Sequence, residues 1–133
     1  LSIMAQTIDC KEGAMISGIH SGLSALNAIQ TKTQVTANNV SNVNTDGFKK
    51  SRATLVEASP QAAGVTIQIE QMATPGPMLY ESTEKDDSLV EKSNVELTEE
   101  LPRMLIDRRA YQANIKSIQA QDEMLGSLLD IKS

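Results

Sequence analysis

The sequence is poor in the residues that build a thick globular core. Of its 133 residues one is phenylalanine, two are tyrosine and none is tryptophan, so aromatic residues make up only 2% of the chain. Aromatic side chains supply much of the apolar surface of ordinary cores. Aliphatic residues, alanine and methionine must therefore do the packing, which favours narrow contacts between helices over a large compact core.

A single cysteine and a single histidine limit the chemistry that the chain can carry out. Cys10 alone excludes an intrachain disulfide, and Cys10 with His20 falls short of the ligand cluster that a metal site needs. His20 has no acidic residue beside it to support a nucleophile and base, and no glycine-rich phosphate loop follows a predicted strand. We therefore expect a protein that is not an enzyme and has no cofactor, no metal and no small-molecule substrate.

Long apolar runs are also absent. No stretch is long enough to cross a membrane, and residues 1–14 lack the basic start and continuous apolar core of a secretory signal. We therefore expect no direct membrane insertion and no cleaved signal peptide. Residues 1–14 also lack a clear period, so we expect a flexible N-terminal extension that ends before Met15.

Charges of both signs are present but separated along the chain. Four basic residues against one acidic residue give residues 15–56 a net charge of +3, whereas eleven acidic against three basic residues give residues 57–107 a net charge of −8. Nucleic-acid binding requires a continuous basic face, so the separation argues against a nucleic-acid partner. It is compatible with subunits whose unlike regions meet, and equally with a solvated acidic loop.

Two long patterns of apolar residues at helical spacing dominate what the sequence does contain. In residues 15–43 and again in residues 94–131, the positions alternate by three and four residues, as in the seam of a coiled coil. Each seam needs a partner in the same chain, in neighbouring molecules, or in both. We predict a mainly α fold in which the N- and C-terminal helices form an antiparallel coiled coil. The polar interruptions of the seams, which favour packing completed by further chains, are Gln30, Thr33, Arg108 and Asp122.

The start of the second helix carries two conflicting signals. Ser93 or Asn94 can cap it, whereas Pro102 lies inside the pattern and removes one helical hydrogen bond. We expect a kink or a frayed first turn there.

The middle of the chain, residues 51–93, lacks helical periodicity. Alternating apolar residues at positions 65–69 predict a half-buried strand, and Thr74-Pro75-Gly76-Pro77 predicts a rigid turn. Residues 78–80 could then pair back on that strand as a hairpin. We predict a small irregular or β-rich excursion, too short for an independent domain.

Four asparagines are crowded into residues 38–44, at the end of the first helical pattern. Asparagine tolerates left-handed backbone, and its amide can cap the carbonyl groups left open at a helix end. In the tight turn over residues 44–47, Gly47 supplies a positive φ. The passage is predicted to end the helix and to offer hydrogen bonds to a neighbouring molecule.

Two sets of residues resemble one known family. Residues 21–26 and 37–49 closely resemble the N-terminal signature of bacterial flagellar rod and hook proteins, and residues 93–100, 109–114 and 122–125 are similar to the matching C-terminal signature. The residues that match the family motif are Asn38, Asn39, Ser41, Asn42, Asn44, Thr45, Gly47, Phe48, Arg109, Tyr111, Gln112 and Asn114.

The resemblance implies a structural subunit of the flagellar basal-body rod in the periplasm. Such a subunit assembles with copies of itself and with other axial subunits into a tube that transmits torque, and it is exported by the flagellar type III apparatus without a cleaved signal. The short middle segment resembles that of a proximal-rod subunit, whereas residues 74–79 are similar to distal-rod relatives. The residues expected to pack between subunits are Ile19, Leu23, Leu26, Val40, Leu101, Met104, Tyr111, Ile115, Ile118 and Leu125.

This hypothesis divides the chain into four parts. They are the N-terminal extension (1–14), the first rod helix with the asparagine-rich motif (15–50), the excursion (51–93) and the second rod helix (94–133). The alternative is a cytoplasmic helical-hairpin adaptor. An adaptor would share the seams but would have no need for the crowded asparagines.

Overall fold

The computed structural model describes residues 2–59, 64–83 and 86–130, with a long helix at each end and strands between them. The elements in chain order are α1 (Ser2–Ser41), β1 (Ser51–Glu57), β2 (Val65–Gln71), β3 (Met78–Thr83), β4 (Asp86–Glu91) and α2 (Leu97–Asp130). The prediction of a mainly helical chain with a small β-containing middle is confirmed. None of the described helices is both long and apolar enough to span a membrane.

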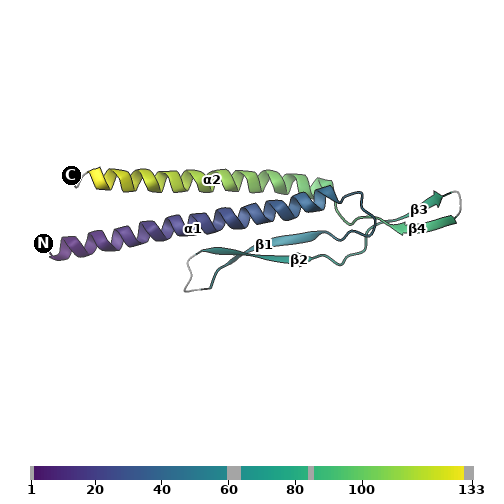
Figure 1. Ribbon diagram of the computed structural model, residues 1–133, viewed down its shortest axis with the longest axis horizontal. Helices are drawn as coiled ribbons and strands as arrows, with labels where there is room; N and C mark the ends of the chain where they lie inside the picture. The colour runs from purple at the N-terminus through teal and green to yellow at the C-terminus, as the bar shows by residue number, and fades with distance from the viewer. Residues whose placement is uncertain (1, 60–63, 84–85, 131–133) are drawn as a thin grey trace.

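The two helices lie side by side and run in opposite directions, so both ends of the chain lie at the same end of the molecule (Figure 1). As residue numbers rise along α1, those of the facing residues on α2 fall. The facing pairs are Gly18 with Gln121, Gly22 with Ile118, Lys32 with Asp107 and Asn39 with Glu100. The antiparallel arrangement brings the two halves of the sequence into contact over most of the length of α2.

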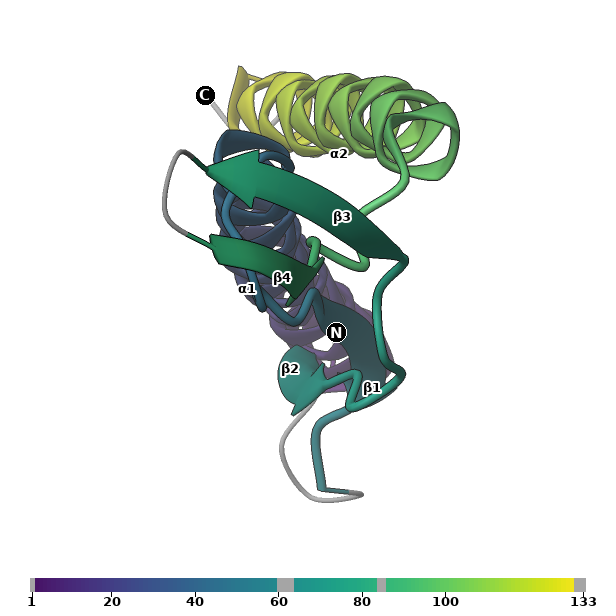
Figure 2. The same cartoon turned by 90° about the vertical axis from the view of Figure 1, so that its right-hand side faces the viewer.

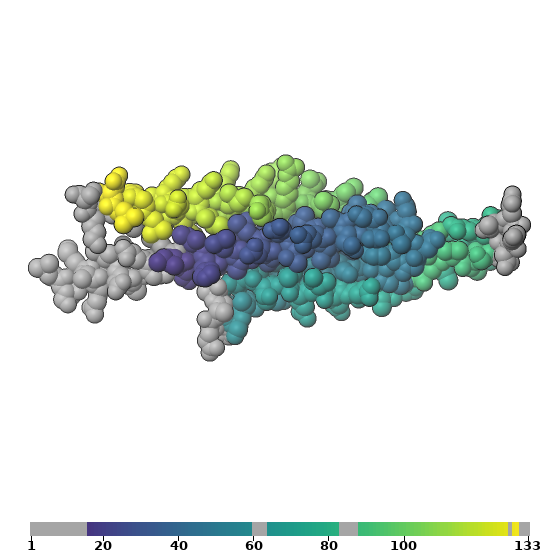
Figure 3. Space-filling model, in the orientation of Figure 1, coloured from purple at the N-terminus to yellow at the C-terminus, as the bar shows by residue number. Residues whose placement is uncertain are grey.

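A first hairpin, β1–β2, covers α1 on the side away from α2 (Figure 2). Its strands are antiparallel, in a register from Ser51 opposite Gln71 to Glu57 opposite Val65. The far end of the hairpin is tied to the helix where the Val65 amide donates to Ser24 Oγ at 3.0 Å. The molecule is therefore built in three layers, in the order α2, α1 and the hairpin. The space-filling view shows each layer in contact with the next (Figure 3).

A second hairpin, β3–β4, projects beyond the paired helices at the end away from the termini (Figure 1). Strand β2 pairs with β1, and β3 pairs with β4, so the prediction that residues 78–80 pair back on the 65–69 strand is wrong. Two prolines explain the difference, because each disfavours α-type backbone in the residue before it. Pro75 and Pro77 therefore carry the chain onward instead of reversing it within four residues.

The helix boundaries also differ from the sequence prediction. Helix α1 begins at Ser2 instead of Met15, so within the described residues 2–14 the expected flexible extension is helical. That segment contains no proline, and its one interior glycine, Gly13, costs about 1 kcal/mol, which does not stop a long helix. Helix α2 contains Pro102 in its second turn. Its first turn is closed by the Glu96 carbonyl, which accepts from the Glu99 and Glu100 amides, both at 3.0 Å, so the prediction that Ser93 or Asn94 caps it is wrong.

The interior is narrow and unusually polar. The buried apolar side chains among the described residues are Ala28, Ile29, Ala53 and Val95, and the buried polar ones are Thr36, Asn39, Ser93, Glu100 and Asp107. Small residues let the helices approach closely. A Cβ on Gly22 would lie 2.9 Å from Cγ1 of Ile118, and one on Gly18 would lie 3.0 Å from Oε1 of Gln121.

The face of α1 that turns inward is displaced by one residue from the predicted seam. The inward residues are Gly18, Gly22, Ile29, Lys32, Thr36 and Asn39, each immediately before a predicted seam position. One residue turns an α-helix by about 100°. The apolar seam of α1 therefore lies beside the face that contacts α2, and Leu23 on that seam is 49% exposed.

Candidate functional site: an asparagine junction and an open groove

Asn39 joins three elements at the point where α1, α2 and β1 meet. Its side chain is 1% exposed. Its Nδ2 donates to the Ser51 carbonyl at 2.7 Å, and its Oδ1 accepts from the Ser51 amide at 2.9 Å. The same Nδ2 lies 3.4 Å from Oε2 of Glu100 on α2. Asn39 thus pairs with the first residue of β1 as a neighbouring strand would, because its side-chain amide, like a backbone amide, offers a donor nitrogen and a separate acceptor oxygen.

Asn94 forms a second junction where three extended segments cross. Its Oδ1 accepts from the Lys50 amide at 2.6 Å. Its Nδ2 donates to the carbonyls of Met72 and Thr74, at 3.0 and 2.8 Å, and its own amide donates to the Phe48 carbonyl at 3.2 Å. Because all these bonds go to other segments, Asn94 holds the crossing together instead of capping α2.

Charged groups lock the base of the projecting hairpin. Lys49 Nζ binds Oε1 of Glu91, and the same oxygen accepts from the Gly76 amide at 2.8 Å. The bond from Lys49, followed by that from Gly76, lowers the pKa of the Glu91 carboxyl from its ordinary 4.5. A Cβ on Gly76 would lie 2.0 Å from the Lys92 carbonyl oxygen. The backbone crossing at Gly76 therefore leaves no room for any side chain.

Lys92 bridges the turn after α1 to the same hairpin. Its Nζ binds Oδ1 of Asp46 at 2.7 Å and also binds Oε1 of Glu81. These bonds, that to Asp46 first, raise the pKa of the Lys92 ammonium from its ordinary 10.5. Gly47, with φ +67°, turns its amide onto the Glu91 carbonyl at 2.7 Å. The positive φ predicted for Gly47 is confirmed.

Of the remaining asparagines, only Asn42 bonds within the last turn of α1. Asn42 Nδ2 donates to the Asn38 carbonyl at 2.9 Å, and its Oδ1 accepts from Thr45 Oγ1 at 3.1 Å. This closes the last turn, as the sequence predicts for a helix-ending motif. Asn38 and Asn44 have exposed side chains, which leaves them facing outward beside the junction.

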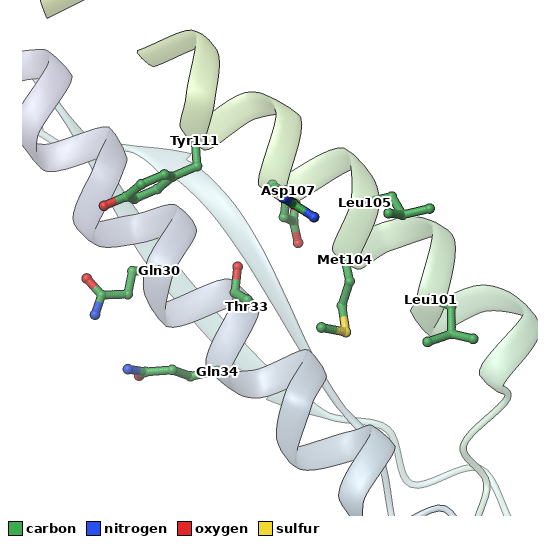
Figure 4. Close-up of a pocket in the computed structure, with 9 residues that line it drawn as sticks. Gln30, Thr33, Gln34, Leu101, Met104, Leu105, Asp107 and Tyr111 are labelled. Carbon is green, nitrogen blue, oxygen red and sulfur yellow. The ribbon is translucent and has the colours of Figure 1, made fainter. Parts of the chain in front are cut away.

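Beside the junction, an open groove runs between α1 and α2 (Figure 4). It has a volume of about 770 Å³. The lining residues are Gln30, Thr33, Gln34, Leu101, Met104, Leu105, Asp107, Arg108 and Tyr111. Six of these nine are predicted seam positions. The seam that the sequence predicts therefore faces a groove that the chain itself leaves uncovered.

Asp107 lies in this groove with half of its carboxylate unsatisfied. Its side chain is 4% exposed, and Oδ1 accepts from Lys32 Nζ at 2.7 Å. Its Oδ2 is buried and has no hydrogen-bond partner among the described residues. A buried carboxylate oxygen without a donor costs free energy, so the Asp107 side chain destabilises the contact between the helices in part.

Four of the ten predicted packing residues line the groove or lie at the contact between the helices. Leu101 and Tyr111 are exposed and Met104 is half-buried in the groove, while Ile118 lies against Gly22. The other half-buried members are Ile19, Leu26, Val40, Ile115 and Leu125. Of the C-terminal motif residues, Arg109 and Gln112 are exposed and Asn114 is half-buried.

Sequence reasoning missed several residues that hold the junction. Asn94 was considered only as one of two candidate helix caps, and no local pattern marks Glu91 and Lys92, which bind Lys49 and Asp46 after α1. A glycine between two prolines was a signal that could have marked Gly76. Asp107 was missed because its neighbour Arg108 occupies the predicted seam position on α2.

Comparison with known proteins matches both ends of this arrangement. A family model described as "Flagella basal body rod protein" matches residues 19–49, and one described as "Flagellar basal body rod FlgEFG protein C-terminal" matches residues 87–131. The chain belongs to the flagellar rod and hook family of axial proteins. The predicted recognition is confirmed.

Curated relatives in this axial family come from several bacteria. The flagellar basal-body rod protein FlgG of Bacillus subtilis is 46% identical over 59 residues, which are 40% of this chain and 22% of that protein. FlgG of Borreliella burgdorferi is 43% identical over 44 residues (33% and 17%), and the flagellar hook protein FlgE of Salmonella typhimurium is 32% identical over 77 residues (58% and 18%). The chain spans about a fifth of the length of the relatives it matches.

The matched segments of this axial protein contain the asparagine of each junction. Asn39 lies in the first segment, and Glu91, Asn94 and Glu100 lie in the second. The groove is built from the same two segments, since its lining residues all lie within them.

Proposed function

We propose that the chain is a structural subunit of the flagellar basal-body rod, which assembles with copies of itself and with other axial subunits into a tube that transmits torque. In this proposal residues 15–50 and 94–133 form the rod, residues 51–93 form an excursion from it, and the paired helices complete a coiled coil only within the polymer. Export by the flagellar type III apparatus without a cleaved signal, and a periplasmic position in the basal body, belong to the same proposal.

The observation that carries the proposal is the imbalance between covered and uncovered apolar side chains. Four apolar residues are buried among the described side chains, whereas fifteen large apolar residues are exposed. Full burial of one such side chain contributes about 1.5–3 kcal/mol. Covering several of them in a polymer would supply a large driving force for association, and assembly would stabilise the fold by mass action.

The proposal assigns separate roles to the two parts of the site. The seam residues of both helices supply the apolar surface that neighbours cover. The asparagine junctions and the charged base of β3–β4 fix the direction in which the excursion leaves the helices. A rigid junction matters for a torque-transmitting subunit, because a flexible one would let the helices and the excursion turn independently.

Incorporation into basal bodies tests this function. The tagged chain should co-purify with basal bodies from flagellated cells of its host. Leu23→Asp, at a seam residue that is 49% exposed, should leave the free chain folded but abolish incorporation and motility. Ser17→Asp, on an exposed side chain of the same helix outside the seam, is the control and should retain both. An adaptor would instead stay in the cytoplasm as a small oligomer, and motile cells carrying Leu23→Asp would refute the proposal.

A further inference from the structure

The β3–β4 hairpin is held to the rest of the chain only at its base. Its two strands pair with each other, and among the described residues neither strand packs against a helix or against another strand. The hairpin leaves Met78, Tyr80 and Leu89 exposed, so no apolar core ties it to the helices beyond which it projects (Figure 1). An isolated two-stranded hairpin gains little stability of its own. Its direction therefore depends on the bonds at its base.

The two backbone segments that connect the hairpin to the rest of the chain cross at one narrow point. A Cβ on Gly76, in the segment that enters β3, would lie 2.0 Å from the Lys92 carbonyl oxygen, so the two backbones touch there. On the hairpin side, the Lys92 amide donates to the Pro77 carbonyl at 2.9 Å. On the helix side, the Asn94 side chain clamps its neighbours. Each side is bonded within itself, which makes the crossing the place where one side can turn against the other.

Three bonds join the hairpin and Lys92 to the turn after α1 in the described part of the chain. One is a backbone bond, in which the Gly47 amide donates to the Glu91 carbonyl at 2.7 Å. The other two are ion pairs, one between Lys49 and Glu91 and one between Lys92 and Asp46 at 2.7 Å. Two of the three bonds that fix the direction of the hairpin therefore depend on charge.

Both ion pairs are partly exposed, so water and salt reach them. The side chains of Lys49 and Glu91 are 23% and 32% exposed, and those of Lys92 and Asp46 are 25% and 49% exposed. A pair of this kind shifts an equilibrium by up to about fivefold. Salt weakens it, because the screening length falls from about 10 Å at 0.1 M to about 3 Å at 1 M. Lys92 also binds Glu81 on β3, so its ammonium links the turn after α1 to both strands of the hairpin.

We propose that β3–β4 is an arm whose direction is set by a salt-sensitive latch, made of the Lys49–Glu91 and Lys92–Asp46 pairs, and that the arm turns about the crossing at Gly76 when the latch is lost. A latched arm keeps one direction relative to the helices, and a released arm samples several. The use of a fixed direction in an assembly rests on the proposed function, whereas the latch itself is a property of the single chain.

Distances between two spin labels on the full chain test the latch. In a Cys10→Ser background, labels are attached to Ala37→Cys on α1 and Ser88→Cys on β4, both at exposed positions, and pulsed electron paramagnetic resonance gives the distance distribution. Lys49→Gln and Lys92→Gln should each raise the population outside the main peak by up to about fivefold. Raising sodium chloride from about 0.05 M to about 1 M should broaden the distribution of the unsubstituted latch. The same change should have no effect on the double variant.

Arg103→Gln is the matched control for the loss of a charge. It removes one cation and one partly exposed ion pair, with Glu99 at 3.6 Å, but this pair lies within α2 and does not touch the hairpin. The control should leave the distance distribution unchanged. Lys92→Arg keeps the cation and should retain the narrow distribution, which separates the charge of the side chain from its identity.

A second label pair, at Tyr80→Cys and Leu89→Cys, distinguishes a turning arm from a melted one. Tyr80 lies directly opposite Leu89 across the hairpin, so dipolar broadening between these labels should persist in the latch variants. Loss of this broadening would overturn the proposal, as would a distribution between Ala37→Cys and Ser88→Cys that neither the substitutions nor salt change. Because these measurements use the free chain, their failure leaves the proposed function standing, and failure to enter basal bodies leaves the latch standing.

Discussion

Replacing Asn39 by alanine tests the central junction of the fold. The substitution removes both hydrogen bonds to Ser51, at 2.7 and 2.9 Å, and the longer one to Glu100, at 3.4 Å. Each buried polar group left without its partner costs about 1–3 kcal/mol. Ser51 is only half-buried, so water recovers part of that cost. We expect Asn39→Ala to lower the free energy of unfolding by about 2–4 kcal/mol, a large part of the 5–15 kcal/mol typical of a domain.

Asn39→Asp sharpens the test because it keeps the shape of the side chain. The carboxylate still accepts from the Ser51 amide, but it cannot donate to the Ser51 carbonyl, and it lies 3.4 Å from an oxygen of Glu100. Two carboxylates at that distance in a buried site repel each other and take up a proton more readily in the folded than in the unfolded chain. This variant should be at least as destabilised as Asn39→Ala near neutral pH and should regain stability as the pH falls.

Urea unfolding followed by far-UV circular dichroism measures both variants. The matched control is Asn38→Ala, at the preceding residue, whose side chain is exposed, and it should change the free energy of unfolding by no more than about 0.5 kcal/mol. If Asn39→Ala is as mild as this control, or if Asn39→Asp loses as much stability on acidification as the unsubstituted chain or more, the account of the junction is wrong.

Three further substitutions test the crossing and its charges. Gly76→Ala should destabilise the chain by about 1–3 kcal/mol or more, because its Cβ would lie 2.0 Å from the Lys92 carbonyl oxygen. Gly126→Ala is the control: its Cβ would have no heavy atom within 4 Å, and it should stabilise α2 by up to about 1 kcal/mol. If urea unfolding shows Gly126→Ala to be the more destabilised of the two variants, the packing described is wrong. The lowered pKa of Glu91 means that its stabilising contribution is present above pH 4.5 and is lost as the pH falls through the lowered value. Glu91→Gln should therefore flatten the dependence of the urea midpoint on pH in this range. An unchanged dependence would show that the Lys49 and Gly76 bonds do not act as described. Asn94→Ala should destabilise the chain by about 2–4 kcal/mol through the loss of three side-chain bonds, and hydrogen exchange at the Lys50 amide should rise; unchanged protection there would argue against the clamp.

The existence of the two long helices and the end of α1 were predictable from the sequence, but the start of α1 and the face that each helix turns inward were not. Apolar periodicity marks the faces that need cover without saying which molecule provides it. Within the chain the inward face of α1 is made by Gly22, Lys32 and Asn39. These residues are polar or have no side chain, so apolar periodicity does not mark them as contact positions. The apolar seam beside them is left to face the groove.

The pairing of the strands depended on features that local patterns do not encode. An alternating segment at residues 65–69 predicted a strand, but its partner was decided by the prolines at 75 and 77 and by the backbone crossing at Gly76. Asn94 looked like a helix cap because it immediately precedes the helical pattern. Its true partners, including Lys50 and Met72, are distant in sequence, and no local rule identifies them.

The most direct test compares the groove in the free and the assembled chain. In the Cys10→Ser background, the rate at which a small maleimide modifies Leu105→Cys is measured for the purified chain and for the same chain in isolated basal bodies. Because Leu105 is 62% exposed in the single chain, the account predicts fast modification of the free chain and a rate at least about tenfold lower after assembly, as expected when a neighbour excludes water from a contact. Equal rates in the two states, or no chain in the basal bodies, would contradict the claim that neighbouring subunits cover this groove.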